Sequence, residues 1–214
     1  GWTMSVLGAF FGNTQMALLS QLDVVNAMLA SIGVAPVSSI ETSVSRDTAV
    51  ALDSLDRVSR AVQMEGWEFG VVREVTPTPD VDGKITFGGN VYQAVLNKDV
   101  SGQPDVQPVL HGSALFDNKN KTYVFYSSNL PVLDITYVRE WDELPEVARM
   151  YIMVKAIREF SDNVSGRVAT HQFKQADEDM ARSELVRWDD KVRDTNLRGL
   201  EYWRFLNRSG GSIY

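Results

Sequence analysis

The chain has 214 residues, of which 44% are hydrophobic and none is cysteine, and its formal net charge is -7. This length suffices for one ordinary domain or for two small ones, each with an apolar core. The acidic balance argues against a protein that grips nucleic acid through its phosphates, and the lack of cysteine excludes disulfides, thiol nucleophiles and cysteine-ligated zinc.

The first 22 residues carry no charged side chain. They lack the basic start and the small-residue cleavage site of a secretory signal. The apolar run at 6–11 is interrupted by Gly8 and is too short to span a bilayer. We therefore interpret residues 1–13 as a flexible or partner-seeking arm, with a targeting signal as the alternative, and we expect no membrane contact.

The first predicted helix begins at Thr14. Apolar positions recur three or four residues apart, at Leu18, Leu22, Val25, Leu29 and Ile32. Asn13 or Thr14 would supply the N-cap, and Gly33 followed by Pro36 would end the helix.

A second helix is predicted from about Ser45 to Gly66, with Asp47 in its first turn. One face carries the apolar residues Leu52, Leu55, Val58 and Val62. An amphipathic pattern of this kind indicates a helix that packs this face into a core.

Beyond Trp67 the pattern changes to short stretches rich in β-branched and aromatic residues. They are VVREVT (71–76), KITF (84–87), NVYQAV (90–95), SALF (113–116), TYVFY (122–126) and LDITYVREW (133–141). Such stretches are typical of strands, and the Gly, Pro, Asn and Asp residues between several of them suit tight hairpins. Because no long helical pattern separates them, we expect an antiparallel sheet.

The stretch REWDELPEVARMYIMVKAIREF (139–160) begins with four carboxylates within seven residues. Glycoside hydrolysis needs two carboxyl groups at a set separation, so Asp142, Glu143 and Glu146 are candidate catalytic residues. The favoured interpretation is a helix entrance. In that case Pro145 lies in the first turn and Glu146 lies at the positive end of the helix dipole.

A last long helix is predicted from about Thr170 to Asn196. Its inward candidates are Phe173, Met180, Trp188 and Val192. Three oppositely charged pairs lie four residues apart, namely Lys174 with Glu178, Glu178 with Arg182, and Asp189 with Arg193. These charges indicate a solvated face.

The tail at 199–214 carries four large apolar side chains close together, Tyr202, Trp203, Phe205 and Leu206. Such a cluster near a terminus often marks a partner contact, so these are the predicted partner-binding residues. Docking of the cluster onto its own domain is the alternative.

Little else in the sequence resembles a chemical site. His111 and His171 lie in different elements, and no two-histidine metal spacing, nucleophile elbow or phosphate-binding glycine loop occurs. Glu65 and Glu68 are a further acidic pair of the kind that any acidic chain offers. We predict no metal site and no cofactor.

Together these elements predict an α+β fold. Two N-terminal and two C-terminal helices form a helical layer that is discontinuous in sequence, with an antiparallel β region inserted between them. We expect a helical domain at 14–70 and 142–198, a β domain at 71–141, and a C-terminal tail at 199–214, after the arm at 1–13.

Several of these stretches resemble the tail tubular protein A family of short-tailed, podovirus-type bacteriophages. They are NAMLASIGVAPVSSIE (26–41), EGWEF (65–69), PDV (79–81) and YVREWDELPEVARMYIMVKAIREF (137–160). The first resembles the family's helix that ends in A-S-I-G, with a proline and a turn into S-x-x-E. The last is similar to its acid-x-Pro-Glu helix start and its K-A-x-R-x-F continuation. The arm at 1–13 and the stretch 97–111 depart from the family pattern.

The resemblance implies a homo-oligomeric ring, a dodecamer, that connects the portal protein to the tail nozzle protein (tail tubular protein B). DNA would pass through its centre without specific binding. The implied location is the virion tail, after assembly in the host cytoplasm. We expect the helical layer to pack around the ring, the β domain to face the nozzle, and residues 202–206 to seek the portal. A tail-associated polysaccharide (glycoside) hydrolase, as an alternative or second activity, and a non-phage interaction module are the competing hypotheses.

Overall fold

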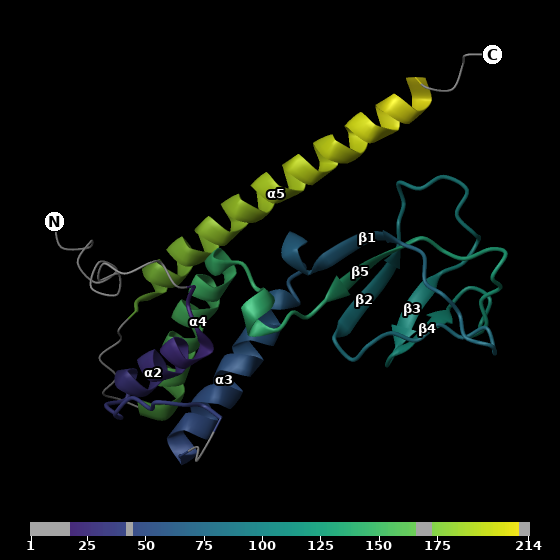
Figure 1. The fold of residues 1–214 in the computed structure, drawn as a ribbon. Coiled ribbons are helices and arrows are strands. Elements are labelled where there is room, and N and C mark those ends of the chain that lie inside the picture. The colour runs from purple at the N-terminus through teal and green to yellow at the C-terminus, as the bar shows by residue number, and fades with distance from the viewer. Residues whose placement is uncertain (1–17, 42–44, 166–172, 210–214) are drawn as a thin grey trace.

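The computed structural model describes residues 18–41, 45–165 and 173–209, without the side chains of residues 165 and 197–209. Its helices are α2 (Gln21–Ser31), α3 (Arg46–Gln63), α4 (Glu146–Ser165) and α5 (Gln175–Ser209). Its strands are β1 (Val71–Val75), β2 (Val91–Leu96), β3 (Pro108–His111), β4 (Ala114–Asp117) and β5 (Leu133–Tyr137). Single 3-10 turns, η1 (Glu68–Gly70) and η2 (Trp141–Glu143), flank the β region. This arrangement confirms the predicted α+β fold (Figure 1).

Helix α2 begins later than predicted. The Ser20 hydroxyl accepts the Asp23 N–H at 3.2 Å, and the Asp23 carboxylate accepts the Ser20 N–H at 3.0 Å. This capping box satisfies backbone donors at the start of the helix. Residues 18–20 are not helical, and Leu18 is 60% exposed. The prediction of one continuous helix from Thr14 is therefore wrong.

Helix α3 follows the prediction closely. The Ser45 hydroxyl caps it by accepting the Thr48 N–H at 3.2 Å, and Leu55, Val58 and Val62 are buried as expected. The helix ends near Gly66, whose φ of +89° lies in the left-handed region that favours glycine.

Helix α4 is the centre of the helical layer and packs against α2, α3 and α5. Its largest fully buried side chains are Tyr151, Ile152, Ile157 and Phe160. Figure 1 shows α2, α3 and α4 gathered on one side of the molecule, with the β region on the other. The helical layer is thus built from segments far apart in the sequence.

The β region is antiparallel, as predicted. Three strands pair in the order β1-β5-β2, and Ile135 of β5 lies opposite Val72 of β1 and Ala94 of β2. Strands β3 and β4 form a separate hairpin, in which Leu110 faces Leu115. The last strand in the sequence is therefore the central strand of the sheet.

Two predicted strands differ from those observed. The segments 84–87 and 122–126 form only isolated bridges, Lys84 with Val124 and Thr86 with Ala114, although Ile85 and Phe125 are buried. Strand β3 was not predicted, because it is short and begins with Pro108, which cannot donate to a ladder.

The buried apolar residues of the β region form a cluster of their own. It consists of Ile85, Ala94, Leu115, Phe125, Leu133 and Ile135. The larger cluster of the helical layer draws on all four described helices and includes Met28, Leu55, Phe160 and Leu185. Each part of the described chain thus has its own apolar core.

Helix α5 differs from its prediction at both ends. It starts at Gln175 and continues to Ser209, past the expected end at Asn196, because Gly199 alone does not break a helix. Phe173 and Trp188 pack on the core as expected, but Met180 is 63% exposed and Leu185 is the fully buried residue. Figure 1 shows the C-terminal half of α5 extending well beyond the helical layer.

Candidate functional site

The acidic stretch at 139–146 forms the entrance to helix α4. The Glu143 carboxylate accepts the Glu140 N–H at 3.1 Å, and both oxygens of Glu146 lie 3.1 Å from the Leu19 N–H. Helix α4 begins at Glu146, so the helix-entrance interpretation is confirmed. These two carboxylates hold backbone N–H groups, as acidic side chains do near helix N-termini.

The same entrance fastens the chain that precedes α2. The Leu19 carbonyl accepts hydrogen bonds from Trp141 Nε1 at 2.9 Å and from Arg149 Nη1 at 3.1 Å. Arg149 is buried and also donates to the carbonyls of Asp142 at 2.8 Å and Leu144 at 3.0 Å. Asp142 thus contributes its backbone oxygen here. The candidate catalytic residues therefore lie around a network of hydrogen bonds that holds Leu19 against the start of α4.

Glu65 and Glu68, the second acidic pair, have separate partners. Glu65 accepts from Arg182 of α5 at 3.0 Å, which raises the pKa of the Arg182 guanidinium. Glu68 is buried and bonds to Arg73, whose pKa is raised chiefly by this hydrogen bond. Both glutamates connect elements of the fold.

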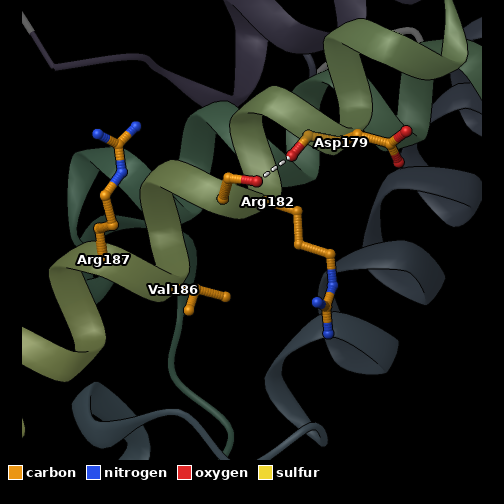
Figure 2. Close-up of a pocket in the computed structure, with 5 residues that line it drawn as sticks. Asp179, Arg182, Val186 and Arg187 are labelled. Atoms are coloured by element: carbon orange, nitrogen blue, oxygen red, sulfur yellow. Dashed lines mark hydrogen bonds between the residues drawn. The ribbon is translucent and has the colours of Figure 1, made fainter.

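A hollow of about 440 Å³ lies along one side of α5 and is lined by Asp179, Arg182, Ser183, Val186 and Arg187. Figure 2 shows the side chains of Arg182 and Arg187 leaving the helix in different directions. Asp179 supplies the one carboxylate among these lining residues, and it accepts from Gln175 at 3.0 Å. A pair of carboxylates, which glycoside hydrolysis requires, does not line this hollow.

Two buried carboxylates hold the first half of α5. Glu178 accepts from Arg158 Nε at 2.6 Å and from Lys155 Nζ at 3.3 Å, both on α4. Burial is the largest single influence on Lys155 and lowers its pKa, but the hydrogen bond to Glu178 and the negative charges of Glu178 and Glu159 together outweigh it, so the net pKa is raised. One turn beyond Leu185, Asp189 accepts the Glu68 N–H at 2.6 Å.

These contacts show that part of the charged face of α5, which was predicted to be solvated, is buried against α4 and η1. The pairing of Asp189 with Arg193 is confirmed at 2.8 Å. The predicted partners of Glu178 are wrong, because its carboxylate turns inward to α4 and Arg182 instead bonds to Glu65. Helical spacing predicted that Glu178 lies on the surface, because this pattern considers only partners within one helix. The actual partners, Lys155 and Arg158, belong to α4 and lie 23 and 20 residues earlier in the chain.

Beyond Arg193 the described side chains of α5 are exposed, through Asn196. The predicted partner-binding residues Tyr202, Trp203, Phe205 and Leu206 lie in its last turns, and their side chains are outside the described part. The helix itself continues to Ser209, so the backbone carries these positions away from the helical layer (Figure 1).

The β3–β4 hairpin and the segment after it carry an aromatic cluster at the surface that the sequence did not predict, in which His111 and Tyr123 are exposed and Phe116 is half-buried. The rings of His111 and Phe116 stack at 4.5 Å, and Phe116 lies 4.8 Å from Tyr123. His111 Nδ1 and the Tyr123 hydroxyl are 3.2 Å apart. Tyr126, nearby in sequence, is 74% exposed. Exposed aromatic side chains of this kind are enriched at protein interfaces.

The second predicted histidine, His171, lies outside the described residues. Among the residues that the structure does describe, no group of three potential metal ligands gathers. In the same ranges, no helix combines the length and apolar character needed to span a bilayer.

The chain was also compared with known proteins. A family model described as a tail tubular protein matches residues 22–195, in agreement with the resemblance of the sequence motifs. A search of curated proteins finds no match. Because the family match covers most of the chain, this protein belongs to the tail tubular protein family and is a structural protein of the bacteriophage tail.

Proposed function

We propose that this protein is the adaptor subunit of the phage tail. In this proposal, copies of the chain form a ring, a dodecamer, between the portal protein and the nozzle protein, tail tubular protein B. DNA passes through the ring during ejection, and the formal net charge of -7 supports passage without specific binding. Assembly takes place in the host cytoplasm and the product lies in the virion tail.

The observation that carries this proposal is the projection of α5. The helix is anchored as far as Arg193 by contacts with α4 and η1. Residues 194–209 then continue for about 24 Å at 1.5 Å per residue. An element held firmly at one end and extended at the other suits the joining of two assemblies. We assign the portal contact to its last turns, with Tyr202, Trp203, Phe205 and Leu206.

A ring also requires surfaces that differ from each other. A heterologous interface joins two different patches of the same chain, and an adaptor needs further patches for its two partners. The surface aromatic cluster of His111, Phe116 and Tyr123 lies on the β region, on a different element from α5. We assign the nozzle contact to this cluster. We also propose that the helical part (14–70 and 142–198) and the β part (71–141) act as two domains.

Two variants test these assignments in a crossed design. Deletion of residues 200–214 removes the last turns of α5 but keeps its anchors, and the double substitution Tyr123→Ala with Tyr126→Ala removes exposed rings from the β region. The deletion should abolish binding to the portal and preserve binding to the nozzle protein. The double substitution should do the reverse.

Light scattering of the purified chain, alone and with each partner, measures the masses of the complexes. Circular dichroism checks that each variant is folded. If the deletion variant binds the portal as well as the full chain does, the assignment of α5 is wrong. If the full chain forms neither a ring nor a stoichiometric complex with the portal or the nozzle, the adaptor proposal is wrong.

A further inference from the structure

The Glu68 carboxylate lies where three parts of the fold meet. It belongs to η1, its side chain is 4% exposed, and Arg73 of β1 donates to both of its oxygens, at 2.7 and 2.8 Å. Arg193 of α5 approaches the second oxygen at 3.6 Å. One buried carboxylate therefore faces guanidinium groups from the sheet and from the projecting helix.

The contact with α5 is reinforced by the backbone. Asp189, whose side chain is 5% exposed, accepts the Glu68 N–H at 2.6 Å and the Arg193 guanidinium at 2.8 Å. Phe69 and Trp188 add a ring contact at 6.3 Å between centroids. Helix α5 thus holds η1 through the backbone, the carboxylate and an aromatic ring.

On the other side, the contacts continue into the sheet. Arg73 Nη1 lies 3.5 Å from Asp134 of the central strand β5. Asp134 also accepts the Glu74 N–H at 3.1 Å and Asn97 Nδ2 at 2.8 Å, which secures it to β1 and to the end of β2. A continuous series of ion pairs and hydrogen bonds therefore runs from α5 through Glu68 to β1, to β5 and to the residue that follows β2.

We infer that Glu68 is a positioning residue that couples the direction of α5 to the orientation of the three-stranded sheet. Two-oxygen contacts between a carboxylate and a guanidinium are directional, and a buried charge without its partner is costly. A change in the direction of α5 should therefore change the orientation of the sheet as well. In the adaptor proposed above, this coupling would transmit a change at the portal contact to the β region. The coupling itself does not depend on that proposal and is measured on the isolated chain.

The absence of native cysteine permits a direct test. Spin labels at Gln93→Cys on β2 and Asn196→Cys on α5 report the distance between sheet and helix by double electron–electron resonance. A second pair, Asp53→Cys on α3 with Asn196→Cys, reports the distance between the helical layer and α5. All three positions are exposed.

In the parent chain both pairs should give one narrow distance distribution. In Glu68→Gln, the sheet–α5 distribution should broaden, while the α3–α5 distribution should stay narrow because Glu178 and Leu185 still hold α5 on α4. Arg193→Ala, at a half-exposed side chain, should give the same selective change and serves if Glu68→Gln does not fold. Unchanged distributions for both pairs would overturn the inference. So would broadening of both pairs, which would mean that α5 has simply detached.

Discussion

Gln63 and Arg139 lie 76 positions apart in the chain and exchange two hydrogen bonds. The Arg139 N–H donates to Gln63 Oε1 at 2.7 Å, and Gln63 Nε2 donates to the Arg139 carbonyl at 3.1 Å. Gln63 ends α3, and Arg139 follows β5, so this pair joins the segments by which the chain enters and leaves the β region. Because the Gln63 side chain is buried, water cannot easily replace its two hydrogen bonds to Arg139.

Gln63→Ala should therefore lower the free energy of unfolding by about 1 to 3 kcal/mol, because it leaves the half-buried N–H and carbonyl of Arg139 without their partner. Urea denaturation followed by circular dichroism measures this loss. Gln93→Ala, at an exposed position on β2, is the control and should change the stability by less than about 0.5 kcal/mol. Equal effects of the two substitutions would show that the Gln63 pair does not stabilise the junction.

Gly83 and Gly102 offer a matched comparison of backbone and steric effects. Both have positive φ, +77° and +74°, but a Cβ at Gly83 would lie 2.8 Å from Val124 Cγ1, whereas the space at Gly102 is open. Gly102→Ala should cost about 1 kcal/mol through left-handed strain alone. Gly83→Ala should cost about 1 to 3 kcal/mol more, because Val124 must move.

Thermal or urea unfolding of the two glycine variants gives the difference directly. Adding Val124→Ala to Gly83→Ala should recover part of the loss, since it removes the atom that clashes. A result in which both glycine variants lose the same stability would contradict the steric argument.

Asp117 should give the protein a specific sensitivity to acid. Its buried carboxylate accepts the N–H groups of Gln107 and Lys119 at 3.0 Å and that of Asn120 at 3.3 Å. Burial raises the pKa of Asp117, but these hydrogen bonds and the Asn120 side chain outweigh it, so the net pKa lies below the ordinary 3.8. This stabilisation is present above about pH 3.8 and is lost as the pH falls through the lower, folded-state pKa.

Asp117→Asn should then cost about 1 to 3 kcal/mol at neutral pH and flatten the fall in stability below pH 3.8. Urea unfolding at a series of pH values tests both effects. Asp105→Asn is the control, because the Asp105 side chain is 85% exposed although it pairs with Lys119. An acid transition that is identical in the parent and in Asp117→Asn would refute this assignment.

The capping box of α2 makes a prediction about where that helix starts. Ser20→Ala removes the oxygen that accepts the Asp23 N–H and should cost about 1 kcal/mol. Hydrogen exchange of the amides in the first turn of α2 should speed up accordingly. Thr14→Ala, at the N-cap position that the sequence suggested, should leave the exchange rates of those amides unchanged. Faster exchange of the same amides in Thr14→Ala would instead support the predicted helix that begins at Thr14.

The buried Glu178 should contribute far more to the free energy of unfolding than the exposed acidic residues on the same helix. Glu178→Ala leaves Arg158 and Lys155 without their buried partner and should cost about 3 to 5 kcal/mol. Glu184→Ala, which removes an exposed partner of Arg187, should cost about 0.5 kcal/mol or less. Urea unfolding of both variants measures the contrast, and similar losses would mean that Glu178 does not anchor α5.

Local signals in the sequence determined several features correctly. The expected start near Ser45 and the apolar positions Leu55, Val58 and Val62 predicted α3, and the proline and acids at 142–146 predicted the entrance to α4. Alternating β-branched stretches predicted β1, β2 and β5, and ordered motifs predicted the family. These predictions succeeded because caps, periodicity and short motifs involve residues that are neighbours in sequence.

Only the tertiary structure decided which residues act together. Glu146 holds the backbone of Leu19, Glu178 pairs with α4, and β5 lies at the centre of the sheet. No local pattern specifies such partners, because they lie far away in the chain and are selected by packing and by the need to satisfy buried charges. For the same reason, only the tertiary structure shows that Glu143 and Glu146 contact backbone N–H groups at the entrance to α4, and that Glu68 lies between α5 and the sheet.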